Sequence, residues 1–246
     1  MKSKERHKLK ENEFARTVAH ASDLMQTRGR EVTTYATLIV IALLLAGGFG
    51  VWRQTRNARA AGLLASALAV EDAPVIAPSA PAPGSPIPVQ QAGTYPTEQA
   101  KLEAALPELM KAANAYPSTK AGITARYHAA GALASLGRYA EAEQRYQEVA
   151  DKAGNTVYGR TAKLGVADVQ VLQGKYDSAI KIYQEAATDV KSELPLDGVL
   201  MQLGRAYLKA GKRTEAAHAF SRVVDEFPTS TYAADARRAM EEAKKG

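Results

Sequence analysis

The segment GRYAEAEQRY, residues 137–146, has two later counterparts in the chain, GKYDSAIKIY at 174–183 and GKRTEAAHAF at 211–220. Each copy begins with glycine, has alanine at the sixth position and an aromatic residue at the tenth, and lies 37 residues from the next. Residues four positions apart share one face of a helix, so the alanine lets a second helix approach while the ring fills the space beside it. Repetition at such a fixed period predicts a repeat architecture.

Each glycine follows an apolar stretch such as YHAAGALASL at 127–136, so it stands where a helix ends and a left-handed cap favours a residue without Cβ. Each unit is therefore predicted to be a helix hairpin. Pro117 and Pro228 are 111 residues apart, which is three periods, so three complete units lie between them.

The third unit contains Leu203, Gly204, Tyr207, Gly211, Ala216, Phe220 and Pro228. These residues and their spacing resemble the tetratricopeptide repeat. The first two units are degenerate, because Ala129-Ala130 and Val166-Ala167 stand where the third has Leu-Gly. The period of 37 also exceeds the usual spacing of about 34. We read the excess as longer second helices or loops.

Residues on either side extend the repeats. The segment 97–119 has alanine and leucine at second-helix positions but lacks a first helix, for which residues 55–70 are the nearest candidate. Between them, residues 73–96 contain seven of the eleven prolines, which predicts an extended or disordered segment. Residues 232–245 are predicted to form a capping helix with a polar outer face.

Residues 32–52 contain no charge, and 21 helical residues span about 31 Å, the thickness of the hydrocarbon layer of a membrane. One transmembrane helix is expected, and a cleaved signal peptide is the alternative. Ala42, Ala46 and Gly50 follow the small-xxx-small pattern of helices that associate in lipid.

We therefore expect an all-α protein with a single N-terminal transmembrane helix and a tetratricopeptide-like α-solenoid. The solenoid comprises three 37-residue hairpins, a partial N-terminal unit and a C-terminal capping helix. The expected regions are a basic N-terminal tail (1–31), the transmembrane helix (32–52), a juxtamembrane helix with the proline-rich segment (53–96) and the repeat domain (97–246).

Charge and composition narrow the function. The tail holds 8 Lys/Arg against 5 Asp/Glu, whereas residues 73–246 hold 21 against 19, so the repeat domain is nearly neutral and nucleic acid is not an expected partner. The histidines are isolated, cysteine is absent, and no catalytic or phosphate-binding motif occurs. We expect no enzyme activity, no cofactor and no metal. The basic tail favours a cytoplasmic N-terminus, although the cations nearest the span are equal in number on its two sides.

The resemblance implies a protein-binding groove lined by the first helices. Its expected residues are Tyr127 and Gly131 in the first unit, Leu164 and Asp168 in the second, and Met201, Arg205 and Lys209 in the third. The three apolar side chains would form a stripe, and Arg205 and Lys209 would meet an acidic group on the bound segment. The alternative to an open groove is that the capping helix covers this stripe.

The layout as a whole combines the basic tail HKLKENEFA, one span, and the motifs YPST and FPTST. It resembles the membrane-anchored tetratricopeptide proteins related to the ancillary subunit of the bacterial Sec translocon. The resemblance implies an inner-membrane protein with an extracytoplasmic repeat domain, whose partners are translocon subunits, a chaperone or client segments, with lipid around the span. The alternative is an assembly factor of an envelope machine for division, cell-wall or outer-membrane assembly, since Pro228 begins the P-x-S-x-Y-A pattern of such proteins.

Overall fold

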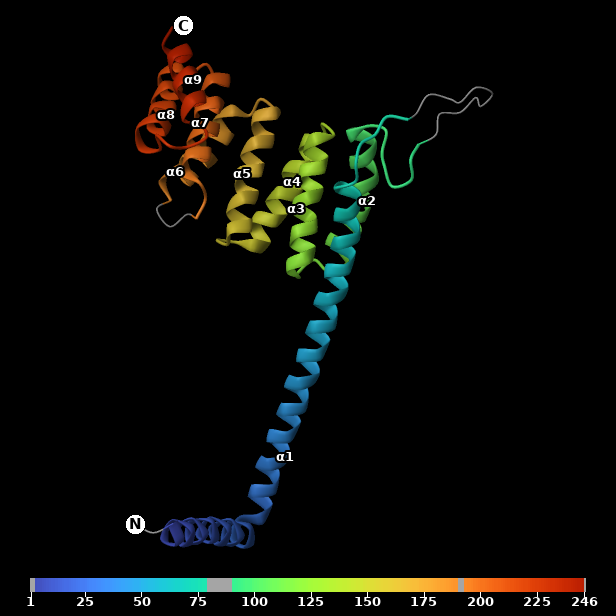
Figure 1. Ribbon diagram of the computed structural model, residues 1–246, viewed down its shortest axis with the longest axis vertical. Coiled ribbons are helices and arrows are strands. Elements are labelled where there is room, and N and C mark those ends of the chain that lie inside the picture. Colours follow the sequence, from blue (N-terminus) through green and yellow to red (C-terminus); the bar gives the residue numbers. More distant parts are fainter. Residues whose placement is uncertain (1–2, 79–89, 190–192, 246) are drawn as a thin grey trace, which may run out of the picture. The chain divides into compact units, whose positions relative to one another are not determined.

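The computed structural model describes residues 3–78, 90–189 and 193–245. In these residues the chain forms helices and no strand, which confirms the all-helical expectation for this part of the protein. The helices are α1 (Ser3–Glu71), α2 (Glu98–Ala115), α3 (Lys120–Ser135), α4 (Tyr139–Ala153), α5 (Val157–Leu172), α6 (Tyr176–Thr188), α7 (Leu196–Lys209), α8 (Arg213–Glu226) and α9 (Ala233–Lys245) (Figure 1). The chain divides into two compact units, Met1–Arg56 and Asn57–Gly246.

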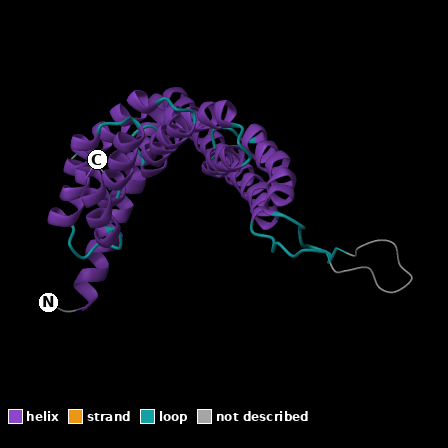
Figure 2. Ribbon diagram, turned by 90° about the horizontal axis from the view of Figure 1, so that it is seen from above, coloured by secondary structure: helices purple, strands orange, loops and turns teal. Residues whose placement is uncertain are grey.

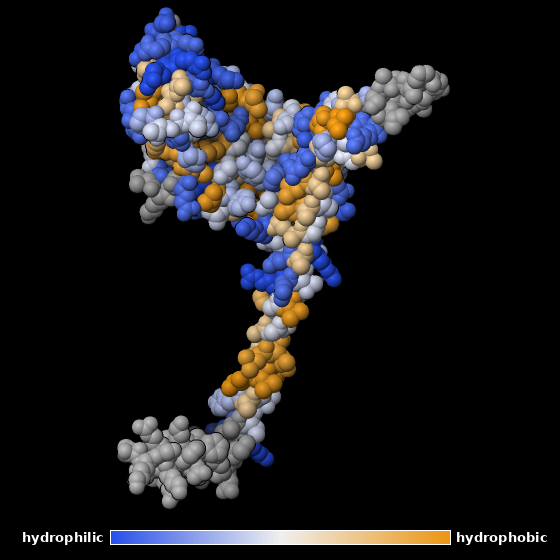
Figure 3. All heavy atoms as spheres, in the orientation of Figure 1, coloured by the Kyte–Doolittle hydropathy of each residue, from blue (hydrophilic) through white to orange (hydrophobic). Residues whose placement is uncertain are grey.

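The first unit is the N-terminal part of α1. This helix continues without a break through the expected boundaries at 31/32 and 52/53. Among the described residues one segment, Thr33–Glu71, is long and apolar enough to cross a membrane. Its most apolar 18 residues have a mean hydropathy of 2.0, and none of them is buried. Figure 3 shows this part of the helix as a band of hydrophobic residues. Ala42, Ala46 and Gly50 are all exposed on it.

In the second unit, short loops join α3 to α4, α5 to α6, and α7 to α8. Gly137, Gly174 and Gly211 lie in these loops with φ of 75–76°, a conformation that glycine adopts without steric cost. After α3, the backbone amide of Arg138 donates to the carbonyl of Leu133 at 2.8 Å, as in a Schellman motif. The sequence therefore placed the hairpin turns correctly, because the left-handed glycine is a local requirement.

The helices α2 to α9 pack mainly on their neighbours in the chain and form a curved row (Figure 2). Ala142, Ala179 and Ala216 are each 0% exposed in the core, where their small side chains allow close helix approach. The first helices also contact one another across repeats, α3 with α5 and α5 with α7, which places them on the inner side of the curve.

The end of α1 belongs to the second unit. Ala67, at 0% exposure, joins the core cluster that contains Leu102 of α2 and Ala129 of α3. Glu71 Oε2 lies within hydrogen-bond distance of His128 Nδ1 of α3, at 2.9 Å. The segment from Asn57 to Glu71 thus packs against residues of α2 and α3.

The two described ends of the proline-rich segment meet in a single parallel β-bridge between Val75 and Tyr95. The amide of Ile76 donates to the Tyr95 carbonyl at 2.9 Å, and the Tyr95 amide donates to the Pro74 carbonyl at 3.0 Å. These bonds connect the end of α1 to the start of α2 at short range. At the other end of the stack, α9 packs on α8 and buries Ala236.

Candidate functional site

A hollow of about 240 Å³ opens on the inner side of the stack, across the first helices of three successive hairpins. We call it the tyrosine hollow, because tyrosine is its most frequent lining residue. It is lined by Tyr127 of α3, Tyr146 of α4, Thr161, Leu164, Gly165 and Asp168 of α5, Tyr183 of α6, Pro195, Gly198, Val199 and Gln202 at and after the start of α7, and Tyr232 before α9.

Asp168 is the acidic residue of the hollow. The Tyr183 hydroxyl donates a hydrogen bond to Asp168 Oδ1 at 2.5 Å, and Tyr183 itself is only 2% exposed. Solvent reaches Asp168 from the open side, but protein atoms surround the carboxyl on its other sides. This burial raises the pKa of Asp168, although the hydrogen bond from Tyr183 acts in the opposite direction.

The neighbouring tyrosines stay protonated well above neutral pH. Burial raises the pKa of Tyr127, Tyr146 and Tyr183, and the Asp168 carboxylate raises it further in each case. The Tyr127 and Tyr146 rings meet edge to face, with centroids 5.4 Å apart. The hollow therefore combines aromatic surface, hydroxyl groups and one carboxyl group.

Several residues named from the sequence lie at this hollow. Tyr127, Leu164 and Asp168 line it. Gly131 lies beside it, since a Cβ at this position would be 3.5 Å from the Tyr146 hydroxyl oxygen. The structure thus brings together the residues expected from the first two repeats.

The third repeat differs from the expectation. Met201 is 2% exposed and belongs to the core, so its side chain does not contribute to an open groove. In α7 the hollow is lined by Gly198 and Gln202 instead. Arg205 and Lys209 are exposed but do not line the hollow. Gly198 and Gln202 are the counterparts, 37 residues on, of Thr161 and Gly165, which also line the hollow. The alignment did not anticipate that Met201, the counterpart of Leu164, is covered, because a repeat period does not say which equivalent positions a neighbouring helix buries.

The alignment also missed three tyrosines of the hollow. Tyr146 and Tyr183 occupy the aromatic position of the second helices, which the sequence assigned to packing alone. Both rings are largely buried, yet they reach the hollow from beneath the first helices. Tyr232 comes from the segment before the capping helix. For Tyr146 and Tyr183, the sequence signal was the aromatic residue repeated at the tenth position of each copy.

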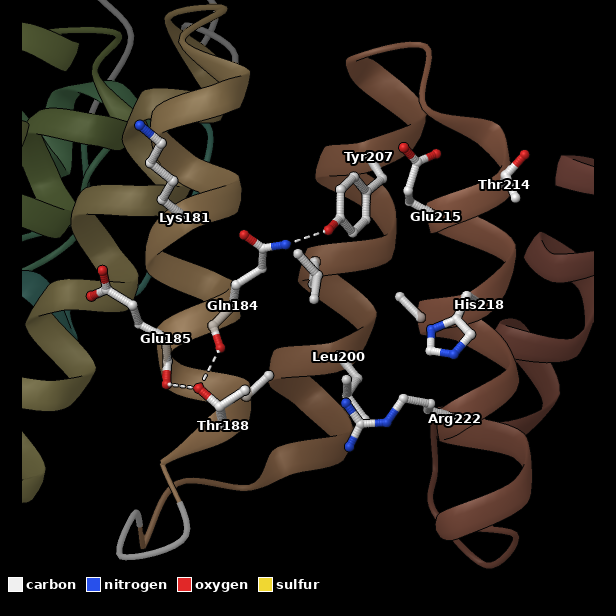
Figure 4. Close-up of a pocket in the computed structure, with 13 residues that line it drawn as sticks. Lys181, Gln184, Glu185, Thr188, Leu200, Tyr207, Thr214, Glu215, His218 and Arg222 are labelled. Carbon is white, nitrogen blue, oxygen red and sulfur yellow. Dashed lines mark hydrogen bonds between the residues drawn. The ribbon is translucent and has the colours of Figure 1, made fainter.

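A second hollow, of about 770 Å³, lies on the outer side, between the second helices α6 and α8. In Figure 4, Lys181, Gln184 and Glu185 extend from one wall and His218 and Arg222 from the other. Leu200 and Tyr207 of α7 lie between the two walls, and Gln184 Nε2 donates to the Tyr207 hydroxyl at 2.7 Å. Charges of both signs surround this hollow, and they do not favour one class of ligand.

Carboxyl groups that could be imagined as a catalytic set have structural partners. Glu141 pairs with Arg138, and Glu148 pairs with Arg126 and Arg145. The side chain of Glu143 accepts hydrogen bonds from the next hairpin, through Gln170, Gln173 and Lys175. Glu143 and Glu148 thus link neighbouring helices. The described residues contain no group of three or more His, Cys, Asp or Glu placed to hold a metal ion.

Comparison with known structures agrees with this architecture. Nearly identical repeats of a putative kinesin light chain from Podosopora anserina align with a TM-score of 0.51 at 15% identity, over 59% of this chain and 78% of that one. A tetratricopeptide repeat protein from Parabacteroides merdae aligns with a TM-score of 0.48 at 15% identity, over 59% of this chain and 54% of that one. The first likeness concerns the fold alone. No curated protein matches the sequence.

The sequence itself matches a family described as a tetratricopeptide repeat-like domain, and the match covers residues 29–244. It therefore includes the apolar part of α1 as well as the whole helical stack. Proteins with such repeats generally act as non-enzymatic scaffolds for protein interaction. With the match covering most of its length, the chain belongs to the tetratricopeptide repeat-like domain family.

Proposed function

We propose that this protein is a membrane-anchored scaffold that binds segments of other proteins in the tyrosine hollow. The observation that carries the proposal is the hollow itself, because it crosses three successive first helices on the inner side of the stack. Tyrosine offers a large contact area at a low cost in conformational entropy and can also form hydrogen bonds, which suits a protein-binding surface. The surrounding grooves would then accommodate the rest of an extended segment.

The wider role we propose is assistance to secreted or envelope proteins, together with the Sec translocon or a chaperone, from the extracytoplasmic side of a bacterial inner membrane. Support comes from the apolar helix segment in Thr33–Glu71, from the basic tail and from the resemblance of the layout. An assembly factor of an envelope machine is the second candidate. It is favoured by the P-x-S-x-Y-A segment, whose Tyr232 lines the hollow.

The binding surface can be tested by photo-crosslinking in membranes. A photoreactive residue is placed at Thr161 or Gln202, which line the hollow, and a matched one at Asp225, which is exposed on α8. We expect the same protein to be captured from both hollow positions and not from Asp225. Tyr127→Ala should weaken this capture while helicity is retained. Capture that is equal from Asp225, or capture only through α1, would contradict the proposal.

The identity of the captured proteins separates the two roles. Translocon or chaperone subunits and their clients support the first role, whereas division, cell-wall or outer-membrane machinery supports the second. The orientation is tested by cysteine labelling, since the chain has no cysteine of its own. A cysteine at Ser178, which is exposed on α6, should react with an impermeant reagent in intact spheroplasts, and one at Ser3 should not. The reverse pattern would place the repeats in the cytoplasm.

A further inference from the structure

The charge of the tyrosine hollow is unbalanced. Asp168 is its acidic residue, and the lining found within the described residues includes no lysine, arginine or histidine. Within that same part of the chain, the polar contact recorded for the Asp168 carboxyl is the hydrogen bond from Tyr183. Asp168 is exposed toward the open side of the hollow, so a cation carried by a ligand can reach its carboxylate, and the attraction there is stronger than in bulk water.

The aromatic rings favour the same type of ligand. The face of a tyrosine ring carries negative charge density and attracts ammonium and guanidinium groups within about 6 Å. Tyr127, Tyr146, Tyr183 and Tyr232 line the hollow from four different parts of the stack. Because the first two rings hold each other edge to face and Tyr183 is hydrogen-bonded to Asp168, this arrangement exists before any ligand binds.

The size of the hollow limits what it can hold. At about 240 Å³ it is smaller than the pockets of about 300–1,000 Å³ that typically enclose whole small-molecule ligands. It is open on one side, so a chain passing along the groove could insert a single side chain. A long side chain with an apolar stem and a charged end would contact Leu164 and Val199 with its stem and Asp168 with its charge.

We propose that the tyrosine hollow receives a lysine or arginine side chain of the bound protein segment, with Asp168 as its counter-ion and the tyrosine rings as its walls. This inference rests on the proposed function, and it specifies the chemistry of the partner. It differs from the expectation that Arg205 and Lys209 bind an acidic group, since neither of these residues lines the hollow.

The test uses the full-length chain in nanodiscs of zwitterionic lipid, so that the bilayer itself does not attract cations. The probes are acetylated and amidated alanine pentapeptides whose central residue is lysine, arginine, norleucine or glutamate. Saturation-transfer NMR titrations measure their relative affinities. We expect the lysine and arginine peptides to bind about tenfold more tightly than the norleucine peptide, and the glutamate peptide to bind least.

Two variants localise the preference. Asp168→Asn keeps an acceptor for Tyr183 but removes the charge, so the preference for lysine over norleucine should fall to near one. The matched control Asp225→Asn removes an exposed carboxyl on α8 and should leave the preference unchanged. Tyr127→Leu keeps apolar surface but removes a ring, so it should reduce the preference without abolishing it. Helicity is measured for each variant.

Each contrary outcome has a distinct meaning. Equal affinity for lysine and norleucine overturns the cation site but leaves groove binding in place. Tightest binding of the glutamate peptide overturns it in favour of a site at Arg205 and Lys209. Failure of all the peptides to bind also overturns it, because the hollow is already formed. The proposed function fails separately, if crosslinks from Thr161 and Gln202 capture no partner.

Discussion

Gly204 of α7 is in contact with the ring of Phe220 from α8, and this contact provides a sensitive test of the packing. A Cβ added at Gly204 would be 2.4 Å from Phe220 Cε1 and 2.7 Å from both Cδ1 and Cζ. Such distances lie far inside van der Waals contact. Phe220 is 0% exposed, so its ring cannot move into solvent to make room. Gly204→Ala should therefore overpack this hairpin.

The magnitude follows from two opposing effects. Overpacking a well-packed core typically costs about 1–3 kcal/mol. Replacing a mid-helix glycine with alanine returns about 0.5–1 kcal/mol, because the unfolded chain loses freedom. The approach of 2.4 Å places the overpacking in the upper part of its range, so the net destabilisation should be about 1–2 kcal/mol. For a unit of the size of Asn57–Gly246, this corresponds to a decrease in Tm of about 2–8 °C.

The assay is thermal unfolding of the full-length chain in detergent, followed by far-ultraviolet circular dichroism. The matched control is Gly131→Ala in α3, where the added Cβ would be 3.5 Å from the Tyr146 hydroxyl oxygen, an ordinary contact. This control should be neutral or slightly stabilising. If both variants melt like the wild type, the inferred approach of α7 to Phe220 is wrong.

Three further predictions concern stability. Ala216→Leu places a larger side chain at a position with 0% exposure and should cost about 1–3 kcal/mol in denaturant titration; an unchanged midpoint would refute the register of the third hairpin. Burial acts to raise the pKa of Glu143, but hydrogen bonds from the next hairpin outweigh it and leave that pKa below 4.5. Glu143→Gln should therefore lower the free energy of unfolding by about 0.5–1 kcal/mol at neutral pH. The loss should become progressively smaller as the pH falls through the lowered pKa. A loss that persists in acid would contradict this. Burial raises the pKa of Asp168 above 3.8, so the wild type gains stability relative to Asp168→Asn as the pH falls through that raised pKa. If the carboxyl were fully solvated, its pKa would not be shifted, and urea titrations at several pH values would show no such trend.

The helical hairpins could be predicted from the sequence because their signals are local. The repeated glycine at the end of each first helix, the alanine at the sixth position and the aromatic ring four residues later depend on helix geometry alone. The apolar run at 32–52 depends on composition alone and indicated a span, in the same region where the structure has an exposed apolar helix. The expected boundaries of this run, at 31/32 and 52/53, are not helix ends in the structure, since α1 is continuous across both.

The tyrosine hollow could be predicted only in part. Tyr127, Leu164 and Asp168 were located by counting from each loop glycine. The count was wrong for Met201, the counterpart of Leu164, because this side chain is 2% exposed in the core and α7 lines the hollow with Gly198, Val199 and Gln202. A period in the sequence sets the spacing of equivalent positions along the chain, but not which of them a neighbouring helix covers.

The sequence by itself determined that this protein is a helical repeat with an apolar N-terminal helix, because helix ends, small packing residues and hydrophobic length are properties of short segments. Only the tertiary structure decided that Tyr146, Tyr183 and Tyr232 line one hollow together with Asp168. These residues are far apart in the chain, and their meeting depends on how closely each hairpin packs on the next. The charge and shape of the hollow arise from that packing.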